Sequence, residues 1–144
     1  MRLLLVGYGK MGRIGEQLSP EYGFEVVGRL DEANNIGGVG IPSAPEADVA
    51  VDFSVPSAVA ENFPKLAARR MNLVIGTTGW QQHEEEMRRL AADAGIGVVA
   101  ASNFSLGVAL FQNLAAQAAK MFAPYSEYGA WIHEIHHAAK KDAP

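Results

Sequence analysis

The chain has 144 residues, of which 49% are hydrophobic and 19% charged, a composition that supports one globular domain with a core. A formal net charge of -4 and the lack of a basic stripe argue against a nucleic-acid-binding protein. Because the chain has no cysteine, disulfides, thiol catalysis and thiolate metal sites are excluded. The apolar run near the N-terminus is too short for a signal peptide, and no stretch of about 18 apolar residues could span a membrane, so we expect a cytoplasmic protein.

Short apolar runs alternate with longer amphipathic segments along the chain. The apolar runs predict strands at residues 3–6, 24–30, 48–53, 73–75 and 98–101. The longer segments predict helices at residues 10–18, 57–70, 80–94 and 106–122, and a stretch rich in Gly and Pro predicts a loop at residues 36–46. Apolar strands separated by helices are typical of a parallel sheet covered on both faces. We therefore expect an α/β fold, a doubly wound parallel sheet of the Rossmann type with right-handed crossovers.

The sequence GYGKMG at residues 7–12 follows the first predicted strand and opens the first predicted helix. Gly7 suits a tight turn, Gly9 would let a pyrophosphate approach the backbone, and Gly12 would let the helix pack close to the strand. Phosphates would bind at the helix N-terminus, where free N–H groups and the helix dipole favour anions. A glycine-rich turn without a ligand is the alternative interpretation.

Asp31 lies 19 residues after Gly12, at the end of the second predicted strand. A carboxylate at this place would accept hydrogen bonds from both ribose hydroxyls of a dinucleotide. A 2′-phosphate about 4 Å from it would cost roughly 1 to 4 kcal/mol at effective dielectric constants of about 80 to 20. Glu32 adds a second negative charge. Unless a cation compensates, we expect NADH to be preferred, with NADPH still possible.

Three more loops follow predicted strands and mix small residues with hydroxyls or amides, at residues 52–56, 76–79 and 101–105. Ligands of open α/β sheets bind beyond the carboxyl ends of the strands, so these loops could contact a cofactor. Ser54, Thr78 and Ser105 are also plausible helix N-caps, and capping alone is the alternative for any single loop. Together, and beside the glycine loop, they favour a dinucleotide site.

The sequence HEIHH at residues 133–137 matches the zinc-protease motif H-E-x-x-H, which binds zinc only on a helix. Residues 128–137 instead predict a strand, because Trp131, Ile132 and Ile135 are of the types enriched in strands. In a strand the first and last histidines of the motif would lie about 13 Å apart, too far to bind one metal. We therefore expect no metal site.

Two adjacent histidines, His136 and His137, are followed by Lys140 and Lys141. A histidine can donate a proton near neutral pH. Nearby cations would bind an anionic substrate and lower the histidine pKa. A single histidine would be interpreted as a surface residue of a strand, without a catalytic role. Two histidines followed by two lysines, in a protein that binds a hydride carrier, instead favour reduction of an unsaturated acid.

These motifs together resemble bacterial 4-hydroxy-tetrahydrodipicolinate reductase, also called dihydrodipicolinate reductase, of lysine biosynthesis. The resemblance covers nearly the whole chain. It is carried by KMG at 10–12, VDFSVP at 51–56, GTTG at 76–79, SNFSLGV at 102–108 and EIHHAAKKDAP at 134–144. The last stretch is the most specific, because it closely follows the family pattern E-x-H-H-x-x-K-x-D-A-P.

The resemblance implies that His136 is the general acid, that His137 binds substrate beside it, and that Lys140 holds a substrate carboxylate and assists protonation. The implied reaction is hydride transfer from the nicotinamide to a ring carbon of a cyclic dicarboxylate, in a homotetramer that uses NADH, NADPH or both. With the glycine loop, the expected cofactor contacts are Gly7, Gly9, Lys10, Met11, Gly12, Asp31, Phe53, Gly76, Thr78, Ala101 and Phe104.

The chain departs from the family pattern in three places. Members that favour NADPH tend to carry arginines where this chain has Glu32 and Val55, which agrees with NADH. The glycine loop is one residue shorter than is common in the family. The S-G-T that follows D-A-P in the family is absent, so we expect a dinucleotide-binding domain at residues 1–125 and the start of a truncated α/β substrate and tetramerisation domain at residues 126–144.

Two other functions stay open. One is an NAD-binding module without turnover, which gains weight because the substrate domain is missing. The other is a related amino-acid dehydrogenase, which shares the glycine loop but should lack the H-H-x-x-K ending.

Overall fold

The computed structural model describes residues 1–133 and 135. The chain divides into two compact units, Met1–Phe104 and Ser105–Pro144. The first unit holds a sheet with its covering helices, and the described part of the second holds one long helix. The domain boundary expected between residues 125 and 126 stays a prediction.

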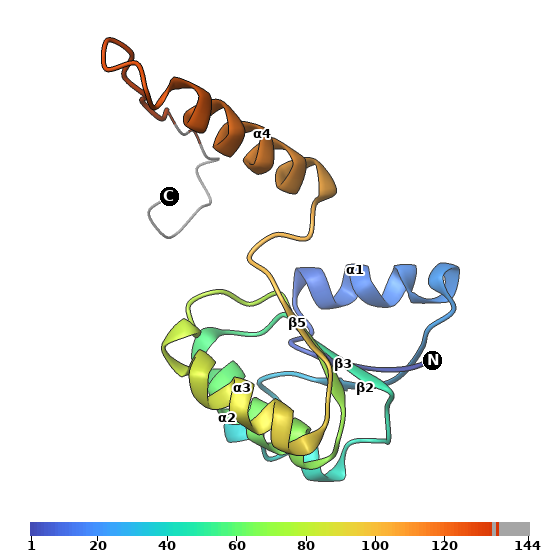
Figure 1. The fold of residues 1–144 in the computed structure, drawn as a ribbon. Coiled ribbons are helices and arrows are strands. Elements are labelled where there is room, and N and C mark those ends of the chain that lie inside the picture. Colours follow the sequence, from blue (N-terminus) through green and yellow to red (C-terminus); the bar gives the residue numbers. More distant parts are fainter. Residues whose placement is uncertain (134, 136–144) are drawn as a thin grey trace. The chain divides into compact units, whose positions relative to one another are not determined.

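Five parallel strands form one sheet in the first unit, in the order β2-β1-β3-β4-β5. Figure 1 labels β2, β3 and β5 of this sheet. The strands are β1 Arg2–Val6, β2 Glu25–Leu30, β3 Val49–Asp52, β4 Asn72–Ile75 and β5 Val98–Ala100. Four consecutive residues of β1, from Leu3 to Val6, are buried. A strand is buried on both sides when helices cover both faces of its sheet. The predicted doubly wound α/β fold of the Rossmann type is confirmed.

Three α-helices cover the sheet, α1 Lys10–Leu18, α2 Pro56–Ala68 and α3 Glu84–Ala94. Leu4 and Val6 of β1 pack in one apolar cluster with Phe63 of α2 and Met87 of α3. Leu3 and Leu5 point to the opposite face because side chains alternate along a strand, and Leu5 lies under α1. The α1 helix and the α2–α3 pair therefore lie on opposite faces (Figure 1).

The loop predicted at residues 36–46 contains two short 3-10 helices, η2 Ile36–Gly38 and η3 Ile41–Ser43. Side chains from α2 and from its C-cap residue hold it in place. The Lys65 ammonium donates a hydrogen bond to the Gly37 carbonyl, and the Arg69 guanidinium donates to the Ile41 carbonyl. Two more 3-10 helices, η1 Ser19–Tyr22 and η4 Gln81–His83, flank α1 and α3. This docking fixes one wall of the groove described below.

The second unit begins with α4, Leu106–Phe122. The Ser105 hydroxyl caps its N-terminus by accepting a 3.4 Å hydrogen bond from the Val108 N–H. Only Lys120 is charged among the 17 residues of α4, and none of them is buried. At about 100° per residue, the polar residues Gln112, Asn113, Gln117 and Lys120 share one side of the helix, and most of its large apolar side chains lie on the other side. Within residues 1–133 and 135, no helix combines the length and the apolar character that a membrane crossing requires.

The strand predicted at residues 128–137 is not found at residues 128–133 and 135. The Tyr128 N–H closes a turn to the Tyr125 carbonyl, and the Tyr128 ring packs 5.2 Å from that of Phe122. Trp131 and Ile132 are 82% and 94% exposed. A strand is stabilised by pairing with a neighbour, and the described part of the second unit contains no other strand to pair with. The other residues of the predicted strand lie outside the described residues.

Candidate functional site

A groove of about 720 Å³ lies at the carboxyl-terminal edge of the sheet. It is lined by residues of the loop after β1, by the end of β2 and the turn after it, and by the loop between β3 and α2. These segments meet because the carboxyl ends of parallel strands share one edge of a sheet. Four of the predicted cofactor residues line this groove: Gly7, Gly9, Asp31 and Phe53.

The glycine loop is shaped by close backbone contacts at two of its three glycines. Gly7 has φ +88°, and a Cβ there would lie 2.3 Å from the Phe53 carbonyl oxygen. A Cβ on Gly12 would lie 2.3 Å from the Gly7 carbonyl oxygen. Gly9 is different, because a Cβ there would meet no protein atom within 4 Å. The fold itself therefore requires Gly7 and Gly12, whereas the open space at Gly9 is available to a ligand.

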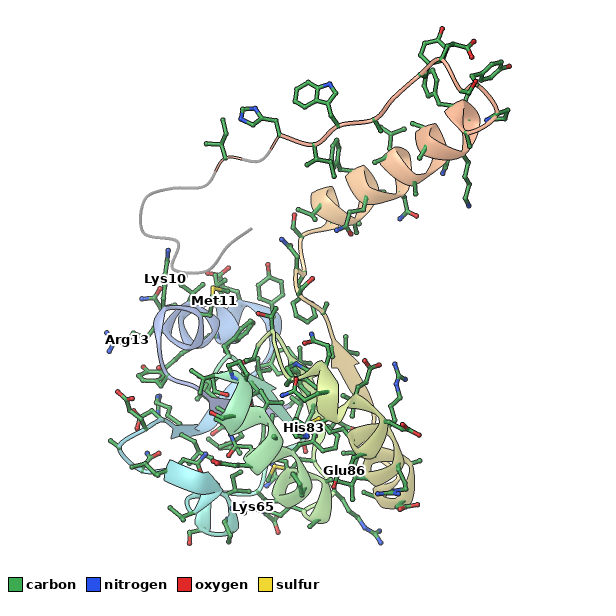
Figure 2. All side chains as sticks on the ribbon, turned by 90° about the vertical axis from the view of Figure 1, so that its left-hand side faces the viewer. Lys10, Met11, Arg13, Lys65, His83 and Glu86 are labelled. Carbon is green, nitrogen blue, oxygen red and sulfur yellow. The ribbon has the colours of Figure 1, made fainter. Side chains whose placement is uncertain are left out.

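The N-terminus of α1 opens beside this space. Its N-cap residue, Gly9, offers no capping side chain, and the first turn contains no acidic residue. Lys10 and Met11 occupy this turn, and both are exposed. Figure 2 shows them on α1 together with Arg13, which lines the groove. Uncapped N–H groups, the helix dipole and nearby cations suit a pyrophosphate.

Asp31 and Glu32, just after β2, also line the groove. Asp31 Oδ1 accepts a 2.9 Å hydrogen bond from the Ala33 N–H, and the Asp31 N–H donates to Asn34 Oδ1 at 2.9 Å. These contacts fold residues 31–35 into a turn that holds the Asp31 carboxyl against the groove. The position fits the ribose of a dinucleotide whose phosphates lie at α1.

A buried carboxylate, Asp52, links the loops after β3 and β4. It is 2% exposed, and its Oδ1 accepts hydrogen bonds from the Ser54 N–H at 2.9 Å, the Ser54 hydroxyl at 2.5 Å and the Thr77 hydroxyl at 3.1 Å. The Phe53 ring fills the space over Gly76, where a Cβ would lie 2.0 Å from Phe53 Cε1. Sequence reasoning missed Asp52, although a charged residue ending an apolar strand is a usable signal.

The remaining predicted cofactor residues lie outside the groove lining. Gly76 and Thr78 follow β4, and Ala101 and Phe104 follow β5, at the same edge of the sheet. Ala101 lines a second hollow, of about 500 Å³, together with Thr77 and Trp80. The structure therefore brings the glycine loop, Asp31 and Phe53 to one groove, and places the residues after β4 and β5 on adjacent loops.

The capping alternative holds for one of the three loops. Ser105 caps α4, but the N-cap residues of α2 and α3 are Val55 and His83, and neither makes a side-chain capping bond. Ser54 instead binds Asp52. Capping therefore does not explain the hydroxyls of Ser54 and Thr78.

His136, His137 and Lys140 lie outside the described residues, so the geometry of the predicted catalytic segment is not part of this site. Within the described ranges, no group of three or more His, Asp or Glu side chains is arranged to hold a metal ion.

Residues 1–104 match the family model described as dihydrodipicolinate reductase, N-terminus. The chain belongs to this family. It is 36% identical over 147 residues to a 4-hydroxy-tetrahydrodipicolinate reductase of Christiangramia forsetii, covering 100% of this chain and 59% of the relative. Reductases of the same name from Beutenbergia cavernae and Archaeoglobus fulgidus are each 34% identical, over 57% and 60% of their lengths and 100% of this chain.

The chain therefore spans about 57–60% of the length of the curated relatives it matches. The family resemblance noted in the sequence is confirmed. The match to the reductase N-terminus and the Rossmann-type sheet together support a nicotinamide dinucleotide as the cofactor.

Proposed function

We propose that this chain supplies the cofactor-binding part of an enzyme that reduces 4-hydroxy-tetrahydrodipicolinate to tetrahydrodipicolinate with NAD(P)H, in lysine and diaminopimelate biosynthesis. One observation carries the cofactor half of the proposal. The uncapped N-terminus of α1 opens onto the free space at Gly9, while Asp31 lines the same groove. The names of the similar proteins support the reaction.

The preferred cofactor in this proposal is NADH. Asp31 and Glu32 both line the groove where the adenosine ribose would bind. A 2′-phosphate about 4 Å from one carboxylate is disfavoured by roughly 1 to 4 kcal/mol at effective dielectric constants of about 80 to 20. That corresponds to about fivefold to nearly 1000-fold weaker binding of NADPH.

The residues proposed for the chemistry follow from the family pattern. When bound, the reduced nicotinamide supplies a hydride to a ring carbon of the substrate. His136 donates the proton, Lys140 holds a substrate carboxylate, and His137 contacts the substrate beside it. A proton donor and a cationic anchor are what a dicarboxylate needs during reduction. The homotetramer and the cytoplasmic location expected from the sequence stay predictions.

A second candidate is an NAD-binding module without turnover. The observation behind it is that the match covers only 57–60% of the length of the relatives named as reductases. Both candidates bind NADH, so binding alone does not separate them.

The test is a pair of measurements on the 144-residue chain. Fluorescence titration measures the Kd for NADH and NADPH, and loss of absorbance at the nicotinamide band measures turnover with freshly generated 4-hydroxy-tetrahydrodipicolinate. Turnover that is abolished by His136→Ala, with the Kd for NADH unchanged, supports the reductase. NADH binding without turnover supports the silent module. No binding of either dinucleotide up to millimolar concentration overturns the proposal.

A further inference from the structure

A cluster of four side chains lies at the rim of the groove, formed by Tyr8, Arg13, Glu16 and Arg29. The Glu16 carboxylate accepts hydrogen bonds from the Tyr8 hydroxyl on one oxygen and from the Arg29 guanidinium on the other. The Tyr8 ring lies close to two cations, with its centroid 5.7 Å from Arg13 Cζ and 5.8 Å from Arg29 Cζ. Tyr8 and Arg13 also line the groove, which places the cluster beside the cofactor.

Arg29 lies close to the proposed ribose position. It is the last residue but one of β2, two residues before Asp31, and its guanidinium lies over the ring of Tyr8, which lines the groove. A ribose held by Asp31 would direct its 2′-substituent to the same neighbourhood. An arginine near this point is what accommodates the 2′-phosphate of NADP in Rossmann-type sites. Arg29 is thus the kind of residue that would favour NADPH.

Glu16 counters this cation. Both of its oxygens are engaged, one by Arg29 and one by Tyr8. The hydrogen bond from Arg29, with a smaller contribution from Tyr8, lowers the pKa of Glu16 to about 2, so the carboxylate is charged at neutral pH. The Arg29 and Glu16 side chains are 45% and 26% exposed, so solvent reaches the pair, and Tyr8, which binds Glu16, lines the groove. A guanidinium held in this way is neutralised and directed toward α1.

We propose that Glu16 is a specificity-determining residue that disfavours NADPH by holding and neutralising Arg29. The inference rests on the proposed function, because it presupposes a dinucleotide in this groove. Glu16 on α1 would then add to the effect of the two carboxylates after β2, Asp31 and Glu32. Glu16 acts by neutralising Arg29, whereas those two carboxylates repel the phosphate directly.

The test compares the ratio of the Kd for NADPH to the Kd for NADH in Glu16→Ala and Glu16→Gln variants of the 144-residue chain. Glu16→Ala frees Arg29, and we expect the ratio to fall by at least about fivefold, the effect of one added opposite charge about 4 Å from the phosphate in a water-like medium. Glu16→Gln keeps an acceptor for Arg29 but removes the charge, so we expect a smaller fall in the same direction.

Two controls make the experiment specific. Glu84→Gln breaks a comparable exposed pair, Glu84–Arg88 on α3, and should leave the ratio unchanged. The double variant Glu16→Ala/Arg29→Gln should not show the fall in the Kd ratio, because it has no Arg29 cation to release. A fall in Glu16→Ala that is absent from both controls supports the inference.

The failures are distinguishable. A ratio in Glu16→Ala within twofold of that of the unsubstituted chain, with NADH still bound, overturns this inference alone. A fall in the Kd ratio that persists in the double variant also overturns the inference, since Arg29 is then not its cause. If the unsubstituted chain binds neither dinucleotide, the proposed function and this inference fall together.

Discussion

Replacing Gly9 by alanine should weaken cofactor binding while leaving the stability of the fold nearly unchanged. Gly9 has φ −83°, which alanine adopts without strain, and a Cβ there meets no protein atom within 4 Å. Alanine gains about 0.4–1 kcal/mol by restricting the unfolded chain, and it loses about as much as a poorer N-cap residue. The free energy of unfolding should therefore change by less than about 1 kcal/mol.

The same methyl group would stand where the pyrophosphate approaches α1. Hydrogen bonds from backbone N–H groups to a charged oxygen contribute about 1.5–3 kcal/mol each. Displacing the phosphates so that one such bond is lost should weaken NADH binding by about 10- to 100-fold. The expected signature of Gly9→Ala is thus a nearly unchanged fold with a strongly reduced affinity.

Urea unfolding and NADH fluorescence titration measure the two quantities. Gly7→Ala is the matched contrast, because Gly7 has φ +88° and its Cβ would lie 2.3 Å from the Phe53 carbonyl oxygen. We expect it to lower the free energy of unfolding by at least about 2 kcal/mol. If Gly9→Ala binds NADH with a Kd within twofold of that of the unsubstituted chain, the phosphates do not pass over Gly9 and the assignment of the groove is incorrect.

Two further predictions concern buried and charged carboxylates. Asp52→Ala leaves the Ser54 and Thr77 donors without their acceptor and should lower the free energy of unfolding by about 2–4 kcal/mol, whereas Asp52→Asn keeps Oδ1 and should cost less than about 1 kcal/mol in urea unfolding. An equal decrease in the free energy of unfolding in both variants would contradict the stabilising role of Oδ1 as an acceptor. The pKa of Glu16, lowered to about 2 mainly by Arg29, lies below the value of about 4.3 in an unfolded chain, so its stabilising contribution is present above about pH 4.3 and is lost as the pH falls toward 2. The difference in Tm between the unsubstituted chain and Glu16→Gln should shrink over that range, and a constant difference would refute the assignment.

Local patterns predicted the parts of the site that local chemistry determines. Runs of apolar residues marked the strands, and the spacing of glycines marked the turn into α1. The positive φ at Gly7 and the tight contact at Gly12 follow from that spacing. The match to the reductase N-terminus over residues 1–104 agrees with this interpretation.

The contacts that the sequence did not reveal join residues distant along the chain. Asp52 and Thr77 are 25 residues apart, and Glu16 and Arg29 are 13 apart. Whether they meet depends on how β3 pairs with β4 and on how α1 packs on the sheet, which no local pattern specifies. The absence of the predicted strand at residues 128–133 and 135 has the same cause, because strand propensity says nothing about whether a pairing partner is present.

The composition of α4 also has a consequence for work in solution. Leu110, Phe111 and Leu114 are each more than 60% exposed on a helix whose single charge is Lys120. Phe111 and Leu114 lie on the apolar side of the helix, and an exposed apolar patch of this kind promotes self-association. Aggregated protein would scatter light and bind NADH non-specifically, without a defined stoichiometry. Light scattering therefore needs to accompany each titration, so that a loss of affinity is distinguished from a loss of monodisperse protein.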